Sequence, residues 1–255
     1  MRMFLALATL LAASPALSQE TGNLKLRFVY GGDAPKPSAI DANKDAQFCG
    51  TGGLVSEKLL VNAENKGIKN VVFYVYTGRG GSKLPPQAPS SKTFTLANDK
   101  CRFEPHILAV QVGDSIKITN PDPVGHNANM NFFANSAQNI TIPPQGEKVV
   151  KIEKPEPAVI PVDCNIHPWM RSYVVALDHP FAAISNDKGE IEIKGLPAGE
   201  TLVFRLYHEA ADSAIREVTM DGKAVELKKN LIELPIKAGD NDLGAITIPA
   251  AALKP

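Results

Sequence analysis

The residues best suited to chemistry lie in one short segment, residues 164–170, which reads CNIHPWM. This segment brings a thiol (Cys164), an imidazole (His167) and a thioether (Met170) onto a single turn of chain. A second imidazole, His126, precedes Cys164 by 38 residues. Two histidines and one cysteine, with a weakly bound methionine, form the ligand set of a blue-copper electron-transfer site. We therefore predict that these four side chains bind one type 1 copper ion.

Copper suits this ligand set for electronic reasons. A soft thiolate and a thioether favour Cu(I), whereas imidazole binds both oxidation states, so a rigid mixed site favours electron transfer. A zinc site would more often show a second cysteine or histidine at close spacing. The alternative without metal is a buried apolar corner in which Cys164, His167 and Met170 are ordinary core residues.

The spacing Cys-x-x-His-x-x-Met, with Pro168 after the histidine, resembles the ligand loop of amicyanin-like members of the cupredoxin (plastocyanin/azurin) family. Three segments ahead of His126 also resemble the family's approach to its first histidine, namely residues 103–105, 110–114 and 118–120. The resemblance covers residues 100–178, and residues 24–76 match the family by strand pattern only.

The resemblance implies a Greek-key β-sandwich that transfers single electrons through an exposed His167. It also implies that Asn127, beside the first histidine, ties the two ligand loops together by hydrogen bonds. The chain departs from the family in a longer region around His126 and in an insert at residues 35–70. Pro168 and Trp169 flank the ligand histidine, and we predict that they form an apolar collar where a redox partner docks, with ordinary loop packing as the alternative.

The cysteine count fits this interpretation. The chain has three cysteines, and in an exported protein two would pair and one would be left over. If Cys164 is reserved for the metal, the simplest partition is a disulfide between Cys49 and Cys101. From the residues alone, any of the three possible disulfides, or no disulfide, stays open.

The first 18 residues, MRMFLALATLLAASPALS, have the pattern of a secretory signal peptide. Arg2 precedes an apolar run at residues 3–13, and small residues close the segment. We predict cleavage before Gln19 and a secreted or periplasmic protein. The alternative is a membrane anchor, for which the run is short, because a spanning helix needs about 20 residues.

Composition excludes several classes of protein. The 255 residues carry 27 basic and 27 acidic side chains, which argues against nucleic-acid binding and against attachment to an anionic membrane. The 44% hydrophobic content is too high for a disordered chain. The 19 glycines and 20 prolines favour short strands joined by turns, so we predict an all-β protein.

Strand patterns divide the mature chain into two predicted domains. Residues 19–179 are predicted to form a cupredoxin-like β-sandwich with a long N-terminal insert that includes about one helical turn. Gly113 and Asp114 predict a hairpin between strands at 107–112 and 115–119. The other predicted strands of this domain are 24–30, 71–76, 93–96, 148–152, 158–162 and 173–177.

Residues 180–255 are predicted to form a second, small β-sandwich that begins with consecutive hairpins over 181–207. Late strands are expected at 217–220 and 231–236. Residues 184–199 are similar to the carboxypeptidase regulatory-like β-sandwich, and this likeness implies a scaffold or an adhesive spacer. An extra sheet on the first domain is the alternative.

Three further histidines need an interpretation. We expect His179 and His208 to be structural. His106 is expected to be a polar strand-edge residue, with a second metal contact or a contact to a redox partner as the alternative.

The function predicted from these features is that of an exported electron carrier and not of an enzyme. Its partners would be other redox proteins, such as a cytochrome or a dehydrogenase. Neither a nucleophile–base pair nor a Gly-x-Ser-x-Gly motif points to a hydrolase, and five histidines are too few for a multi-copper oxidase. The alternatives are a copper-handling protein that does not cycle between oxidation states and a metal-free adhesive β-sandwich.

Overall fold

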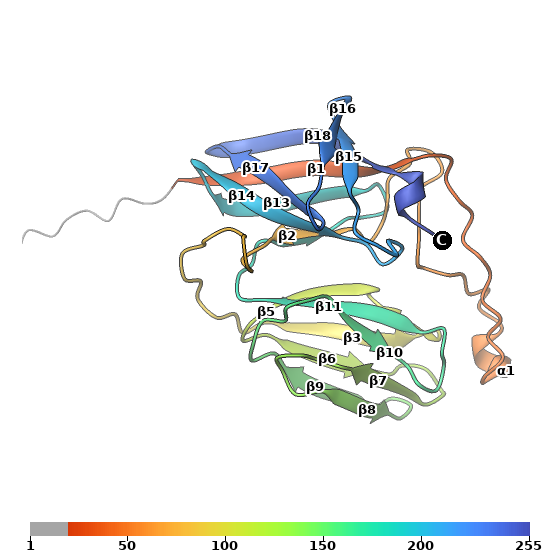
Figure 1. The fold of residues 1–255 in the computed structure, drawn as a ribbon. Helices are drawn as coiled ribbons and strands as arrows, with labels where there is room; N and C mark the ends of the chain where they lie inside the picture. Colours follow the sequence, from red (N-terminus) through yellow and green to blue (C-terminus); the bar gives the residue numbers. More distant parts are fainter. Residues whose placement is uncertain (1–19) are drawn as a thin grey trace, which may run out of the picture.

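The structure is a computed structural model that describes residues 20–255 (Figure 1). The predicted signal peptide, residues 1–18, therefore lies outside the described residues. Almost every regular element is a strand, and the strands form four sheets that stack as two β-sandwiches. The prediction of an all-β protein with two sandwiches is confirmed.

The first sandwich takes its strands from residues 93–177. One sheet has the order β5 (Ile107–Gln111), β11 (Arg171–Leu177), β10 (Ile160–Asp163), β7 (His126–Met130) and β8 (Gln138–Ile142). The other sheet has the order β4 (Arg102–Glu104), β3 (Thr93–Asp99), β6 (Ser115–Thr119) and β9 (Glu147–Lys151).

The second sandwich combines strands from both ends of the described chain. Its larger sheet has the order β13 (Glu190–Pro197), β1 (Thr21–Gly31), β18 (Gly239–Pro249), β15 (Glu217–Met220) and β16 (Lys223–Glu226). Its smaller sheet has the order β12 (Ala182–Ile184), β2 (Val72–Val75), β14 (Glu200–Tyr207) and β17 (Leu231–Ile236). The short helices are α1 (Ala46–Cys49) and η1 (Ala250–Ala252).

These pairings correct the predicted division at residue 179. The prediction placed β1 and β2 in the cupredoxin-like domain, but β1 lies between β13 and β18, and β2 lies between β12 and β14. Strand patterns report burial and not the partner strand, so a strand can join either sandwich with the same pattern. Within residues 20–255, the chain first contributes β1 and β2 to the second sandwich, then forms the first sandwich, and then returns to the second.

Two strands are buried on both faces and join the sandwiches. On β2, Phe73 belongs to the core of the second sandwich, whereas Tyr74 belongs to a separate cluster with β5 and β11. On β11, Val174 belongs to the core of the first sandwich and Val175 to that same separate cluster. Continuous apolar runs are typical of strands covered on both sides. The two sandwiches therefore share an apolar interface.

The turn at Gly113 and Asp114 is not a hairpin. It joins β5 and β6, which lie in different sheets of the first sandwich. The buried Asp114 carboxylate accepts hydrogen bonds from the backbone N–H groups of Lys92 and Gln111, both at 2.8 Å. Gly113 has φ of +96°, where an added Cβ would lie 2.0 Å from the Ser90 carbonyl oxygen. The sequence correctly predicted a turn here, but the turn carries the chain from one sheet to the other, and the side chain of Asp114 stabilises it.

The expected run of hairpins over residues 181–207 is wrong for the same reason. β12 and β14 lie in the smaller sheet of the second sandwich, whereas β13 lies in the larger one. Each of these turns carries the chain from one layer to the other.

Candidate metal centre

The ligand loop joins β10 to β11 at one end of the first sandwich. Cys164 follows the last residue of β10, and Met170 precedes the first residue of β11. Two backbone hydrogen bonds close the loop, from Cys164 N–H to the Met170 carbonyl at 3.1 Å and from Met170 N–H to the His167 carbonyl at 2.9 Å. His126 begins β7, which pairs with β10 in the same sheet. Strand pairing therefore brings the distant histidine to the loop.

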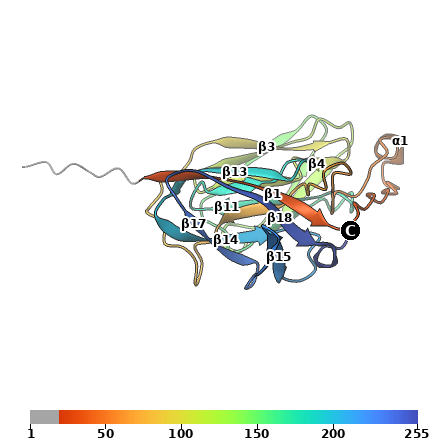
Figure 2. The ribbon, with the colours of Figure 1, turned by 90° about the horizontal axis from the view of Figure 1, so that it is seen from above.

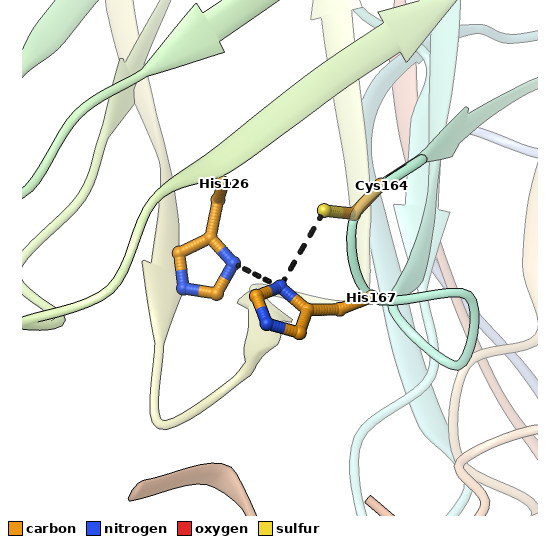
Figure 3. A group of neighbouring side chains, drawn as sticks. All are labelled: His126, Cys164 and His167. Atoms are coloured by element: carbon orange, nitrogen blue, oxygen red, sulfur yellow. Dashed lines mark hydrogen bonds between the residues drawn. The ribbon is translucent and has the colours of Figure 1, made fainter. Parts of the chain in front are cut away.

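Three of the predicted ligands meet in the interior (Figure 3). His126 Nδ1 lies 3.0 Å from His167 Nδ1, and Cys164 Sγ lies 3.9 Å from His167 Nδ1. One ligand atom from each residue falls within 4.8 Å of the other two. His126 and His167 are fully buried and Cys164 is 2% exposed.

A carboxylate holds the outer nitrogen of each imidazole. Asp122 Oδ2 lies 2.9 Å from His126 Nε2, and Asp45 Oδ2 lies 2.8 Å from His167 Nε2. A carboxylate accepts, so each ring donates its Nε2–H outward, and Nδ1 is the nitrogen that faces inward. Carboxylate–histidine pairs of this kind orient histidines that bind metals.

Electrostatics keep His126 suited to metal binding. Burial lowers its pKa, and the neighbouring His167 adds to this effect, whereas the hydrogen bond to Asp122 opposes it. The lowered pKa favours the neutral ring, which is the form that binds a metal ion.

The geometry fits a trigonal metal ion. Three ligand atoms about 2.1 Å from a common centre would lie about 3.6 Å apart, close to the separations of 3.0 and 3.9 Å found here. Two inward lone pairs this close repel one another unless a cation or a proton lies between them. Met170 is 1% exposed and belongs to the same apolar cluster as Cys164, so a thioether lies at the end of the loop.

Asn127 joins the two ligand-bearing segments, as the resemblance implied. Its Oδ1 accepts a hydrogen bond from the Asn165 backbone N–H at 2.7 Å, and its Nδ2 donates to Asn139 Oδ1 at 2.8 Å. The first bond connects β7 to the ligand loop directly. The second connects β7 to β8.

The expectation of an exposed His167 is wrong. Its ring is fully buried, with Asp45 on its outer nitrogen and Trp169 beside it, the two ring centroids 5.2 Å apart. Asp45 precedes α1 with left-handed φ of 49° and does not cap that helix with its side chain. The insert thus provides the cover over the ligand, which its irregular sequence gave no reason to expect.

The predicted disulfide between Cys49 and Cys101 is present and anchors this cover to the first sandwich. The Cys101 carbonyl also accepts a hydrogen bond from Trp169 Nε1 at 3.0 Å. In Figures 1 and 2, α1 lies at the same end of the molecule as the C-terminus and opposite the start of β1.

A second group of metal-ligand types, Cys101, Asp122 and His126, overlaps the first. Its cysteine is in the disulfide and has no thiolate to offer. Asp122 accepts hydrogen bonds from the backbone N–H groups of Lys100 and Cys101 at 2.7 and 2.8 Å. This group therefore orients His126 and does not form a site of its own.

The remaining predicted residues lie around the centre. Pro168 is exposed and Trp169 is partly buried, and both line a cavity of about 340 Å³ between the ligand loop, the insert and the second sandwich. His106 lines the same cavity but lies outside the group of three metal-ligand types. It is 93% buried between two carboxylates, so the strand-edge interpretation did not anticipate its surroundings.

Comparison with known proteins adds little to this geometry. Neither the known family models nor the curated proteins match the chain. Solved structures that resemble it include a Cu(I) mutant of amicyanin, at 20% identity and TM-score 0.30, which covers 33% of this chain and 81% of that one. A reduced amicyanin mutant matches at 19% identity and TM-score 0.30, covering 48% of this chain and 93% of that one. Similarity at this level assigns neither a family nor a metal to the chain.

Within residues 20–255, none of the helices is long and apolar enough to cross a membrane.

Proposed function

We propose that this protein is an exported type 1 copper protein that carries single electrons between redox partners. One observation carries the proposal: two imidazoles, each held from outside by a carboxylate, direct their Nδ1 atoms at one another at 3.0 Å beside a buried thiol. Copper bound there would supply reversible one-electron chemistry. His126, Cys164 and His167 would hold it, with Met170 as the weak fourth ligand.

The residues of this chain contribute rigidity and the exclusion of water. Both histidines are fixed by charged hydrogen bonds, and the ligand loop is closed by its own backbone and by Asn127. A site that cannot relax between the geometries of two oxidation states keeps the reorganisation small, which favours electron transfer over bond-making chemistry. This supports a carrier, with a cytochrome or a dehydrogenase as the proposed partner, and not an enzyme.

The buried His167 changes where a partner would dock. Pro168 and Trp169 remain accessible, and Trp169 contacts the His167 ring. We place the docking collar at these two residues. The likeness of residues 184–199 to a carboxypeptidase regulatory-like module stays a prediction, and in this proposal the second sandwich is a scaffold.

Metal analysis and visible spectroscopy of the purified protein test the proposal. We expect one copper per chain and an intense band near roughly 600 nm in the oxidised form, from charge transfer between thiolate and Cu(II). Cys164→Ser should remove the band while circular dichroism stays unchanged. A colourless oxidised copper protein would favour copper handling without cycling, and a protein that binds no copper would favour the metal-free alternative.

A further inference from the structure

The cavity between the ligand loop and the second sandwich contains a buried imidazole with an unused nitrogen. His106 is 93% buried, and its Nδ1 has no hydrogen-bond partner in the described part of the chain. The other nitrogen, Nε2, contacts the Glu209 carboxylate, whose second oxygen accepts from the Tyr173 hydroxyl at 3.0 Å. In the tautomer that donates Nε2–H to Glu209, Nδ1 carries the lone pair of the ring.

Among residues 20–255, no donor satisfies this lone pair. Glu57 Oε2 lies 3.7 Å from His106 Nδ1, which is too far for a hydrogen bond, and a carboxylate has no proton to offer. A buried acceptor without a donor destabilises the folded protein. A ligand that brings an O–H group into the cavity would supply the missing donor.

The remaining walls favour an aromatic ligand. Trp169 supplies an aromatic surface, and Ile40 and Leu54 of the insert supply aliphatic surface. A volume of about 340 Å³ is near the lower end of the range for small-molecule pockets, which suits a single ring. Arg102, Lys58 and Arg171 also line the cavity, and these positive charges disfavour a metal cation as the occupant.

The cavity also adjoins the metal centre. Met170, the predicted fourth ligand, and Trp169 both line it, and the Trp169 ring lies 5.2 Å from the His167 ring, centroid to centroid. A molecule held against Trp169 is therefore one side chain away from the copper ligands.

We propose that this cavity binds a one-ring hydroxylated aromatic molecule of the hydroquinone class, with His106 Nδ1 as the acceptor of its O–H. This inference rests on the proposed function for its redox step. In that step one O–H bond of the ligand would break, its proton would pass to His106 Nδ1, and its electron would pass to a Cu(II) ion held by His126, Cys164 and His167. A neutral aryloxyl radical would then leave the cavity. The side chain of Glu209 positions the ring and stabilises the imidazolium that forms.

Binding is tested on metal-free protein, so that copper plays no part. The chain has a single tryptophan, so Trp169 fluorescence reports on this cavity alone. Hydroquinone should quench the fluorescence with a saturable curve, and His106→Gln should weaken the affinity at least about tenfold. His179→Gln replaces a buried histidine outside the cavity and should leave the affinity unchanged. Absorption of exciting light by hydroquinone is the same for every variant and cancels in the comparison.

A second ligand and a second variant sharpen the result. 1,4-Dimethoxybenzene has the ring without the O–H, so its weaker binding should be insensitive to His106→Gln. Glu209→Gln keeps His106 in place and should weaken hydroquinone binding as well, which covers the case in which His106→Gln does not fold. Quenching without saturation, or equal affinity in the His106 and His179 variants, would overturn the proposal.

The redox step is tested on copper-loaded protein by following the loss of the band near roughly 600 nm. His106→Gln should slow reduction by hydroquinone about 100-fold, as for the loss of a general base. Hexaammineruthenium(II) donates an electron without a proton, and it should reduce this variant and the unmodified protein equally fast. Equal rates with hydroquinone would overturn the redox step. If no blue band forms at all, the proposed function is wrong. The binding of hydroquinone is still decided by the fluorescence titration of the metal-free protein.

Discussion

Two pairs of buried histidines have contrasting surroundings in this protein, and the contrast separates a candidate binding site from a structural role. His179 and His208 lie where the chain enters and crosses the second sandwich, and the backbone satisfies both nitrogens of each ring. His179 Nε2 donates to the Val75 carbonyl at 2.9 Å, and its Nδ1 accepts from Phe181 N–H at 3.1 Å. His208 does the same with the Lys69 carbonyl at 3.2 Å and Ala210 N–H at 3.1 Å.

In the candidate metal centre, the backbone does not satisfy the nitrogens of His126 and His167. Their outer nitrogens have carboxylate partners, but their inner nitrogens face one another and a thiol. Full burial is common to both sets, so burial alone does not identify a ligand. What distinguishes the candidate metal centre is that its inward-facing atoms, two ring nitrogens and a sulfur, contact only one another, whereas the backbone satisfies the structural histidines.

The largest effect expected from this contrast is on copper affinity. His126→Gln removes one of three strong ligands, so we expect copper affinity to fall at least about 1,000-fold, or about 4 kcal/mol. His208→Gln should leave copper stoichiometry unchanged and lower only the stability. Competition titration with a chelator measures both. Similar copper affinities in the two variants would erase the distinction between the two kinds of histidine.

The next effect concerns pH. Burial lowers the pKa of His208 to about 4. The unfolded state binds a proton from about pH 6.5 downward while the folded state resists it, so stability is lost as pH falls from about 6.5 to about 4. The loss should reach about 3 kcal/mol for this one residue. Urea unfolding of the metal-free protein across this range measures it, and His208→Gln should flatten the profile.

The lowered pKa of His179 acts in the same direction. Its burial is the first cause, and the charge of Asp178 opposes it. If neither His208→Gln nor His179→Gln changes the slope between pH 4 and 6.5, the acid sensitivity does not come from these two buried rings.

A smaller effect separates the two carboxylates of the metal centre. Asp122 is 3% exposed and also binds two backbone N–H groups, whereas the Asp45 side chain is 37% exposed. Loss of a carboxylate that orients a metal-binding histidine typically costs 10–100-fold in metal affinity. We expect Asp122→Asn to lie near the upper figure and Asp45→Asn near the lower, since water screens the exposed group. Copper titration of both variants measures the two losses of affinity. A larger loss of copper affinity in Asp45→Asn than in Asp122→Asn would contradict this prediction.

Much of the site could be predicted from the sequence because its ligands follow a local rule. The spacing of Cys164, His167 and Met170 places all three on one loop whatever surrounds them. Asn127 and the pairing of Cys49 with Cys101 were also predicted, and the structure has both the hydrogen bond and the disulfide. β7 was missed because its residues, HNANM, are too polar to read as a buried strand.

The roles of Asp45, Asp122 and His106 could not be read from the residues. Asp45 lies 122 residues from its partner His167, and Glu209 lies 103 residues from His106. Nothing in the spacing of an aspartate or a glutamate indicates such a partner. The only signal was the unexplained insert at residues 35–70.

By itself, the sequence determined the all-β class and the loop that carries Cys164, His167 and Met170, because these depend on residue type, alternation and short spacing. The tertiary structure decided that β1 and β2 belong to the second sandwich and that Asp45 covers His167. It also decided that His106 faces a cavity with an unused nitrogen. The physical reason is that strand partners and burial are set by long-range contacts, which a local pattern permits but does not choose.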